Sequence, residues 1–444
     1  MSYKVGFISL GCAKNQVDCE QMMFRMQEAG FAVLPEVDGA DLVVINTCGF
    51  IDAAKSEAID HILAMGKLKQ AGRIGKILVT GCLAQRYQDE ILKEMPEVDG
   101  VLGTGSYFDV VPAALELLER PGTVHHYGDI DAAIPECGRI LTTPAHYAYL
   151  KIAEGCSNRC AYCVIPQLRG KYRSRQMADV LQEAENLAQQ GVRELIVVAQ
   201  DTTLYGVDLP PHRKLLPELL TKLCAIDGIH WVRVHYMYPE VMTDELIETF
   251  AREKKLTPYF DIPIQHVNDD ILKAMNRRGT KTYLQTLFDK IRSRVPDCVI
   301  RTSLIAGLPG EGEAEFLELC DFLKRNRLER VGAFVYSPEE GTPAAEMPRP
   351  DEETAKTRAQ YIEQLQSRIM DEWCQEKVGA SIEVLCEGFD DESGLYYGRS
   401  QWDSPDIDSR VWFTGRDLVP GEFVQVAVTA VRDGELQGAA CQEE

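Results

Sequence analysis

The residues best suited to chemistry in this sequence are three closely spaced cysteines, Cys156, Cys160 and Cys163. They share a short loop between Gly155 and Pro166, so their thiolates can bind one small inorganic group. Soft sulfur ligands select iron–sulfur clusters or zinc. Zinc usually has a fourth Cys or His close by, and none follows within the next forty residues. The loop is therefore predicted to hold three irons of a [4Fe-4S] cluster, which leaves the fourth iron open to a substrate.

Three further cysteines each follow a short apolar run in the first part of the chain. Cys12 comes after KVGFISLG, Cys48 after LVVINT and Cys82 directly after KILVTG. Such runs are typical of buried parallel strands, and open parallel sheets bind their ligands at the C-terminal edge. These cysteines are therefore predicted to be neighbours and to bind a second [4Fe-4S] cluster, again with one open iron.

Cys19 is a fourth candidate ligand, but it lies on the apolar side of a predicted helix, Val17–Ala29. A free cysteine in that position behaves as a small core residue, so we do not count it as a ligand. The other seven cysteines have no partner at ligand spacing and are expected to be core or surface thiols.

Length and composition indicate a multidomain globular protein. The chain has 444 residues, 45% of them hydrophobic and 26% charged, and this length suggests about three domains. Its N-terminus has neither a basic stretch nor a long apolar one, so neither a signal peptide nor a membrane span is predicted. Fourteen cysteines without an export signal favour a reducing, cytoplasmic location.

The order of strand-like and helix-like runs predicts an α/β protein with three folded parts. These are an N-terminal parallel-sheet α/β domain, a central partial (β/α)6 barrel, and a small C-terminal antiparallel β-barrel. The predicted boundaries are 1–120 for the N-terminal domain, 121–145 for a linker that could contain a hairpin, 146–345 for the central domain, 346–377 for a bridging helix and 378–444 for the small barrel.

Polar residues at the ends of the central strands are candidates for the active face, because parallel barrels carry their sites at the strand C-termini. These candidates are Gln200, Asp201, His235, Tyr236, Gln265, His266, Arg301, Tyr336 and Ser337. The segment from Ser303 to Gly310, which includes Ile305 and Gly307, offers an apolar surface and a close backbone approach suited to an adenine ring.

Charge is distributed unevenly along the chain. Between 151 and 175, six Lys and Arg residues stand against Glu154 alone, which predicts either a patch that attracts carboxylates or an interdomain salt-bridge patch. The whole chain has a net charge of −22, and 378–444 has four Arg against fourteen Asp and Glu. A barrel that binds RNA should be basic, so this one is expected to bind a basic partner and not free nucleic acid.

Several motifs together resemble the methylthiotransferase family of radical S-adenosylmethionine (SAM) enzymes, whose members end in a TRAM barrel. These motifs are GCAKNQVD, NTCGF, VTGCLAQR, the cysteine loop with IPQLRGKYRSR, IQHVNDDILKAMNRRG and SLIAGLPGE. NTCGFIDAAKSE, YLKIAEGC, LYGVDL and the acidic barrel are similar to the RimO type within that family. The chain departs from the family at Cys19, where Ser is usual, and at Leu308, where Phe is common.

This resemblance implies a radical SAM methylthiotransferase that modifies the β-carbon of an aspartate in small-subunit ribosomal protein twelve. It implies two [4Fe-4S] clusters, on the two cysteine triads, and SAM. Residues implied to bind the cofactor are Tyr162, Gln200, Arg301, Ile305 and Gly307; no catalytic residue is assigned. The implied partners are a basic ribosomal protein or the 30S particle, and a flavodoxin- or ferredoxin-type reductant.

Three other functions share some of these features. A tRNA adenosine methylthiotransferase would use the same six cysteines, but the acidic barrel argues against it. A radical SAM enzyme of another type with an auxiliary cluster would not explain the barrel. An iron–sulfur electron carrier would have no use for open irons.

Overall fold

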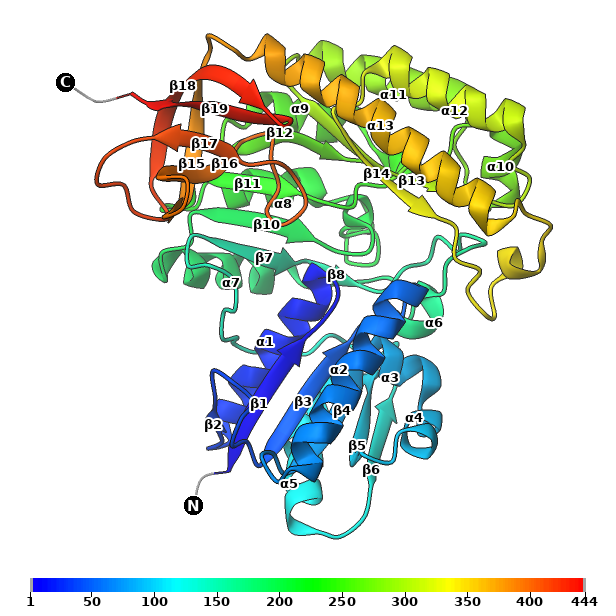
Figure 1. Cartoon of the computed structure of the whole chain (residues 1–444), viewed down its shortest axis with the longest axis vertical. Helices are drawn as coiled ribbons and strands as arrows, with labels where there is room; N and C mark the ends of the chain where they lie inside the picture. The colour runs from blue at the N-terminus through cyan, green and yellow to red at the C-terminus, as the bar shows by residue number, and fades with distance from the viewer. Residues whose placement is uncertain (1–2, 442–444) are drawn as a thin grey trace.

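The computed structural model describes residues 3–441 and consists of three parts in chain order (Figure 1). A six-stranded parallel sheet with helices comes first, a second six-stranded parallel sheet follows, and a closed five-stranded barrel ends the described chain. The predicted fold class is therefore confirmed. In Figure 1 the strands of the N-terminal sheet run upward toward the central domain.

The N-terminal sheet is parallel throughout and has the strand order β2-β1-β3-β4-β5-β6. Its strands are β1 (Lys4–Ser9), β2 (Ala32–Val33), β3 (Leu42–Thr47), β4 (Lys76–Gly81), β5 (Gly100–Gly105) and β6 (Val124–Gly128). Helices α1 (Ala13–Glu28) and α5 (Val110–Glu119) cover one face, and α2 (Asp52–Gln70), α3 (Cys82–Tyr87) and α4 (Asp89–Glu94) cover the other. Every residue of β3 is buried, as expected for a central strand between two helical layers.

The segment from 121 to 145, predicted to be a linker, contains a strand of this sheet. β6 pairs in parallel with β5, so it extends the sheet and does not form a hairpin. In the described part of the chain, β6 lies at the edge of the sheet and has a neighbouring strand on one side only. Its residues His125 and His126 are exposed or partly exposed, so this segment lacks the continuous apolar run that marks a central strand. The sequence pattern therefore concealed it.

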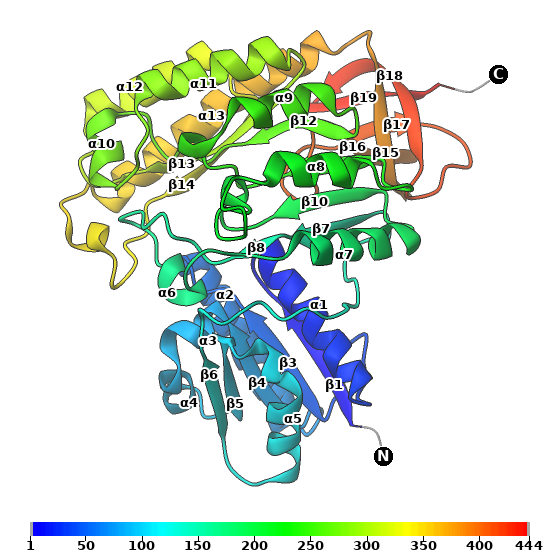
Figure 2. The same ribbon diagram turned by 180° about the vertical axis from the view of Figure 1, so that it is seen from behind.

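The central sheet is also parallel, with the order β14-β13-β12-β11-β10-β7. Its strands are β7 (Tyr147–Lys151), β10 (Glu194–Val198), β11 (Trp231–Val234), β12 (Leu256–Asp261), β13 (Val299–Ala306) and β14 (Arg330–Val335). Its helices are α6 (Ile165–Arg169), α7 (Met177–Gln189), α8 (Leu216–Cys224), α9 (Asp244–Arg252), α10 (Asp269–Ala274), α11 (Lys281–Arg294) and α12 (Glu313–Asn326). Figure 2 shows α7, α8 and α9 as an outer layer on one side of this sheet.

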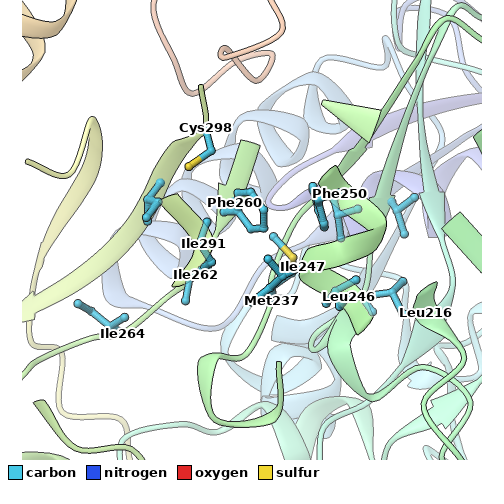
Figure 3. Packing of buried hydrophobic residues seen from close by; sticks show 14 of the residues in the cluster. Leu216, Met237, Leu246, Ile247, Phe250, Phe260, Ile262, Ile264, Ile291 and Cys298 are labelled. Atoms are coloured by element: carbon cyan, nitrogen blue, oxygen red, sulfur yellow. The ribbon is translucent and has the colours of Figure 1, made fainter. Parts of the chain in front are cut away.

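The main core lies between the central sheet and its helices. Phe260 of β12 packs among Ile247 and Phe250 of α9 and Ile291 of α11 (Figure 3). The ring centroids of Phe250 and Phe260 are 4.3 Å apart. Burying side chains of this size stabilises the fold by roughly 1.5–3 kcal/mol each, so this core holds the strand ends in place. No helix within residues 3–441 is long and apolar enough to cross a membrane.

A long helix connects the central sheet to the barrel. Helix α13 (Glu352–Glu376) is capped by the preceding residue, Asp351, whose side chain accepts a hydrogen bond from the Thr354 amide, and it packs along β14. The barrel consists of β15 (Ser381–Asp390), β16 (Leu395–Ser400), β17 (Val411–Thr414), β18 (Phe423–Arg432) and β19 (Glu435–Ala440). Its pairings are antiparallel except for the parallel pair β17–β19.

A tight turn at Asp433 and Gly434 joins β18 to β19. Both residues have positive φ, 52° and 77°, which is the backbone of a type I′ turn and explains why Asp-Gly occupies it.

Buried ion pairs fix the barrel to the beginning of the central strands. Glu194, the first residue of β10, is fully buried and lies 2.7 Å from both Arg233 Nε and Arg399 Nη2. Arg399 also lies 2.7 Å from Glu387. Burial alone would raise the pKa of Glu194, but the two guanidinium groups lower it to about 2. Its stabilising contribution is therefore complete above about pH 4.5 and is lost as the pH falls toward 2.

The segment between β16 and β17, 401–410, continues this contact across the central sheet; we refer to it as the barrel loop. Ser404 Oγ lies 2.9 Å from Nε2 of His235 at the end of β11. Tyr259 of β12 donates to Asp408 over 2.6 Å, and Arg330 of β14 lies 2.6 Å from Asp403. The barrel loop is therefore bonded to three central strands or their ends.

Replacing Arg399 by Met should weaken the attachment of the barrel. The Arg399→Met variant leaves Glu387 and Glu194 with fewer compensating charges in a buried site, and breaking such a pair costs about 3–5 kcal/mol. Urea unfolding followed by tryptophan fluorescence measures this loss. The control is Arg432→Met, whose side chain is 76% exposed and should change the free energy of unfolding by less than about 0.5 kcal/mol. Equal losses in both variants would contradict a docking role for Arg399.

Candidate active site between two cysteine triads

One large cavity, of about 1240 Å³, lies between the N-terminal and central domains. Its walls include all six cysteines that the sequence singled out: Cys12, Cys48, Cys82, Cys156, Cys160 and Cys163. The C-terminal ends of β1, β3 and β4 lead to the first three, and the loop after β8 (Ala153–Glu154) carries the others. Both triads therefore face one shared space.

The C-x3-C-x2-C loop is held in shape mainly by backbone hydrogen bonds. The Cys156 amide donates to the Gly170 carbonyl over 3.1 Å, and the Ala161 amide donates to the Met275 carbonyl over 3.0 Å. Arg159 adopts a positive φ of 53°, and its carbonyl accepts a hydrogen bond from the Asn276 side chain at 2.8 Å. The loop is therefore fixed at several points by the segments around it.

Each cysteine of the N-terminal triad follows a strand: Cys48 and Cys82 come directly after one, and Cys12 comes three residues after the end of β1. Cys12 is the residue before α1, Cys48 follows β3, and Cys82 is the first residue of α3. Gly11 allows the close approach of the first two: its φ is 90°, and a Cβ atom there would lie 2.7 Å from Cβ of Cys48. Only glycine fits this position without strain.

Burial acts on the thiols of both triads. Burial raises the pKa of Cys82 and of Cys156 to about 11 and also raises that of Cys163. Burial acts on Cys12 as well, but Lys14 and Arg169 lower the pKa of its thiol. A bound metal displaces the thiol proton, so the six sulfurs are suitable ligands.

Within residues 3–441, no three Cys, His, Asp or Glu side chains are arranged to hold a single metal ion. A cluster is bound differently, because each thiolate binds a separate iron. The two sets of three sulfurs therefore match the [4Fe-4S] prediction in the number and chemistry of their donors.

A buried charge network joins the two halves of the site. Arg169 of α6 lies 2.5 Å from Asp18 of α1 and 3.3 Å from Glu154 of β8. Lys151 lies 3.0 Å from Glu154 and also contacts Asp18. Burial alone would raise the pKa of Glu154, but Lys151 and Arg169 lower it below its usual range. The arginine also donates from Nε to Cys82 Sγ over 3.3 Å. For Lys151 and Arg169 the interdomain salt-bridge interpretation is therefore confirmed.

All five residues that the resemblance implied for cofactor binding line the cavity: Tyr162, Gln200, Arg301, Ile305 and Gly307. Gln200 donates a hydrogen bond to Glu154 at 2.5 Å, whereas its Oε1 is buried and has no partner within residues 3–441. Arg301 is paired with Asp261 at 2.8 Å.

Other strand-end candidates are also placed by the structure. Tyr236, Gln265, Tyr336 and Ser337 line the same cavity. Asp201, His235 and His266 are buried and are not among its lining residues. Asp201 accepts a hydrogen bond from Thr203, His235 lies 2.9 Å from Ser404 Oγ, and His266 Nε2 lies 3.4 Å from Glu311 Oε2. The strand-end rule therefore predicted more site residues than actually line the cavity.

Several lining residues were not singled out from the sequence, among them Lys14, Tyr238 and Arg277. The Tyr238 hydroxyl lies 3.8 Å from Cys160 Sγ, and the Arg277 guanidinium lies 4.0 Å from the centre of the Tyr238 ring. Lys14 and Arg277 belong to motifs that carry the family resemblance. Nothing in the spacing of those motifs separates these two residues from their neighbours as site residues. Tyr238 lies four residues beyond β11, outside the strand-end rule.

Family models match all three parts of the chain. They are the uncharacterized protein family UPF0004 over residues 4–103, the radical SAM superfamily over 150–323 and the TRAM domain over 378–441. The radical SAM match implies SAM and a [4Fe-4S] cluster, and the N-terminal match is consistent with a second cluster. Fold, site and these matches define a radical SAM enzyme of the methylthiotransferase class.

Comparison with individual proteins narrows this class. The chain is 46% identical to the ribosomal protein uS12 methylthiotransferase RimO of Thermoanaerobacter sp. (strain X514), over 98% of this chain and 99% of that protein. It is 44% identical to the protein of the same name from Clostridioides difficile (strain 630), over 99% of both. The chain therefore belongs to the ribosomal protein uS12 methylthiotransferase RimO family.

A solved structure supports the fold. The radical SAM methyltransferase TsrM from Kitasatospora setae superimposes with a TM-score of 0.58 at 15% identity, over 78% of this chain and 77% of that one. At this level of identity the likeness concerns the fold alone.

Replacing Gly11 by Ala should damage the N-terminal triad selectively. In the Gly11→Ala variant the new methyl group meets Cys48, so Cys12 and Cys48 can no longer lie as close together. We expect about half of the iron of the wild-type protein after anaerobic reconstitution, measured by iron and sulfide analysis. Gly191→Ala is the matched control, because Gly191 also has positive φ but has open space around it. Equal iron loss in both variants would show that backbone strain, and not the contact with Cys48, is responsible.

Proposed function

We propose that this protein transfers a methylthio group to the β-carbon of an aspartate in ribosomal protein uS12. The observation that carries the proposal is the cavity that six cysteines share, in a chain related over its full length to uS12 methylthiotransferases. Cys156, Cys160 and Cys163 hold one cluster, and Cys12, Cys48 and Cys82 hold the second. When bound, the clusters and SAM supply a carbon-centred radical and the sulfur and methyl group that are transferred. A flavodoxin- or ferredoxin-type protein is the expected electron donor.

The residues of the chain have separate tasks around these groups. An apolar cluster of Tyr162, Ile271, Met275 and Leu308 packs around Cys160 and Cys163 and keeps water away from that wall. Gln200 offers an unpaired buried oxygen to a donor such as the amino group of SAM. The backbone at Ile305 and Gly307 supplies a surface for the adenosine. These arrangements support cofactor binding at the C-terminal edge of the central sheet.

The TRAM barrel is proposed to bind the basic substrate protein. Part of its acidity is internal, since Glu387, Asp403 and Asp408 face Arg399 or Arg330. Within residues 378–441, six acidic residues of the barrel are exposed, namely Asp391, Glu392, Asp406, Asp417, Glu422 and Asp433. The exposed basic residues of the barrel are Arg410, Arg416 and Arg432. The outer surface is therefore still acidic, which favours a basic protein over free RNA.

A direct assay distinguishes the two substrate classes. The reconstituted protein is incubated anaerobically with SAM, a reductant, and either undermodified ribosomes or bulk tRNA, and the products are analysed by mass spectrometry. One methylthio increment on an aspartate of uS12 is expected. An increment on tRNA adenosine would instead establish the alternative, a tRNA methylthiotransferase, and would refute the interpretation of the barrel charge.

Removing one cysteine from each triad should separate the two tasks of the clusters. Cys48→Ala is expected to abolish methylthiolation but to retain reductive SAM cleavage, measured as 5′-deoxyadenosine by chromatography. Cys160→Ala is expected to lose both activities, because it removes a ligand of the radical SAM cluster. The exposed Cys441 provides the control Cys441→Ala, which should retain both. Loss of SAM cleavage in Cys48→Ala would count against this division of tasks.

Reversing charges on the barrel tests its docking role. The double variant Asp391→Lys and Glu392→Lys should weaken uS12 binding several-fold at low salt, and less as salt screens the charges. The control, Glu57→Lys and Asp60→Lys, makes the same charge change on exposed positions of α2. Titration of uS12 by fluorescence anisotropy measures both. Equal weakening by the two double variants would show that only the total charge matters.

A further inference from the structure

Lys14 is a buried cation that projects into the cavity. It lies in the first turn of α1, two residues after Cys12, and is only 8% exposed. Its ammonium nitrogen lies 3.3 Å from the centre of the Tyr236 ring, which belongs to the opposite domain. Within residues 3–441, no Asp or Glu oxygen lies within 4.0 Å of this nitrogen, so Lys14 forms no ion pair. A buried ammonium group without a carboxylate is costly unless another partner compensates it.

The other cations of the cavity are already engaged or exposed. Basic residues that line it are Lys14, Arg169, Arg277, Arg301, Arg349 and Lys356. The three other buried or half-buried members pair with acidic residues: Arg169 with Asp18 and Glu154, Arg277 with Glu240, and Arg301 with Asp261. Arg349 and Lys356 are exposed, and Lys356 pairs with Glu352. Lys14 is thus the buried cation of this set that has no carboxylate partner within residues 3–441. Its charge acts on the Tyr236 ring and on the Cys12 thiol, and its ammonium group can still bind the carboxylate of a ligand.

The proposed reaction brings a carboxylate into this space. The reacting β-carbon of an aspartate is bonded directly to its carboxyl carbon, so the carboxylate must enter the cavity with it. A desolvated carboxylate needs a cation or several hydrogen-bond donors. We propose, on the basis of the function proposed above, that Lys14 binds the carboxylate of the substrate aspartate and so selects and positions its β-carbon.

The surroundings of Lys14 fix where that carboxylate would lie. Tyr236 has a positive φ of 58°; its amide donates to Asp261 over 2.9 Å and its carbonyl accepts from the Thr202 amide at 3.0 Å. The tyrosine ring is thereby held under the ammonium group and covers one side of it. A carboxylate on Lys14 lies where the wall that carries Cys12 meets the wall formed by the central strands. Lys14 is thus a positioning and specificity residue, with no part in bond breaking.

A double-mutant cycle tests the pairing directly. The probes are two fluorescent peptides with the sequence of the uS12 loop that carries the target aspartate, one with Asp and one with Asn at that position. Each is titrated against the reconstituted protein by fluorescence anisotropy. Lys14→Met should weaken binding of the Asp peptide by roughly 10- to 100-fold, as expected for a hydrogen bond between charged groups. It should change binding of the Asn peptide by less than about twofold, within the small effect of a site away from the contact.

Two variants and two further measurements make this result specific. Lys14→Arg keeps the charge and should bind the Asp peptide more tightly than Lys14→Met does. Lys356→Met removes an exposed cation at the rim of the same cavity and should leave both peptides within about twofold of wild type. Iron content shows whether each variant still holds both clusters, and SAM affinity shows whether Lys14 serves the cofactor.

The outcomes separate this inference from the function on which it rests. If Lys14→Met weakens both peptides equally, or weakens SAM binding instead, the pairing with the substrate carboxylate is refuted while uS12 methylthiolation by the wild type stands. If the wild-type protein does not modify uS12 at all, the proposed function fails and this inference fails with it. A loss confined to the Asp peptide supports the pairing.

Discussion

Four charged side chains, two of each sign, are buried where the N-terminal and central domains meet. Asp18 comes from α1, and Lys151, Glu154 and Arg169 come from the segment around the first central strand and the cysteine loop. Asp18 is compensated only while the two domains remain together, because both of its partners, Lys151 and Arg169, belong to the central part. Separating the domains would leave this buried charge unpaired, at a cost of about 3–5 kcal/mol. Since Arg169 also reaches Cys82, the same network fixes the position of one cysteine triad relative to the other.

The two parallel sheets can therefore act as one site. Each sheet places its ligands at the C-terminal ends of its strands, which is a property of parallel sheets in general. Here residues at the C-terminal edges of both sheets line one cavity, so the two triads share it. The proposed reaction, which uses a cluster on each triad, can therefore take place in one cavity, with no requirement for a moving domain to carry a group between the triads.

The parts of this site that could be predicted from the sequence depend on local chemistry. Cysteine spacing and the strand-end rule identified both triads, and apolar runs identified the sheets. Contacts between distant segments could not be predicted: Lys151 and its partner Asp18 are 133 residues apart in the chain. The helix predicted to begin at Val17 in fact begins at Ala13. The prediction missed its first turn because Lys14 and Asn15 are polar and break the apolar pattern, although both are buried. The number of acidic residues in the barrel also could not show which of them are internal: Asp403 and Asp408 face Arg330 inside the molecule.

The barrel loop, 401–410, fixes the position of the TRAM domain relative to the central sheet. It is bonded to His235, Tyr259 and Arg330 on three different parts of the central sheet, so the barrel is a rigid extension of the catalytic body and not a module on a flexible tether. A partner bound to its outer surface is held at a constant reach from the cavity. The shape of the partner then helps to decide which aspartate enters the cavity. What matters is how far, and in which direction, the loop that carries the aspartate extends from the face that docks on the barrel. The residues next to that aspartate contribute as well.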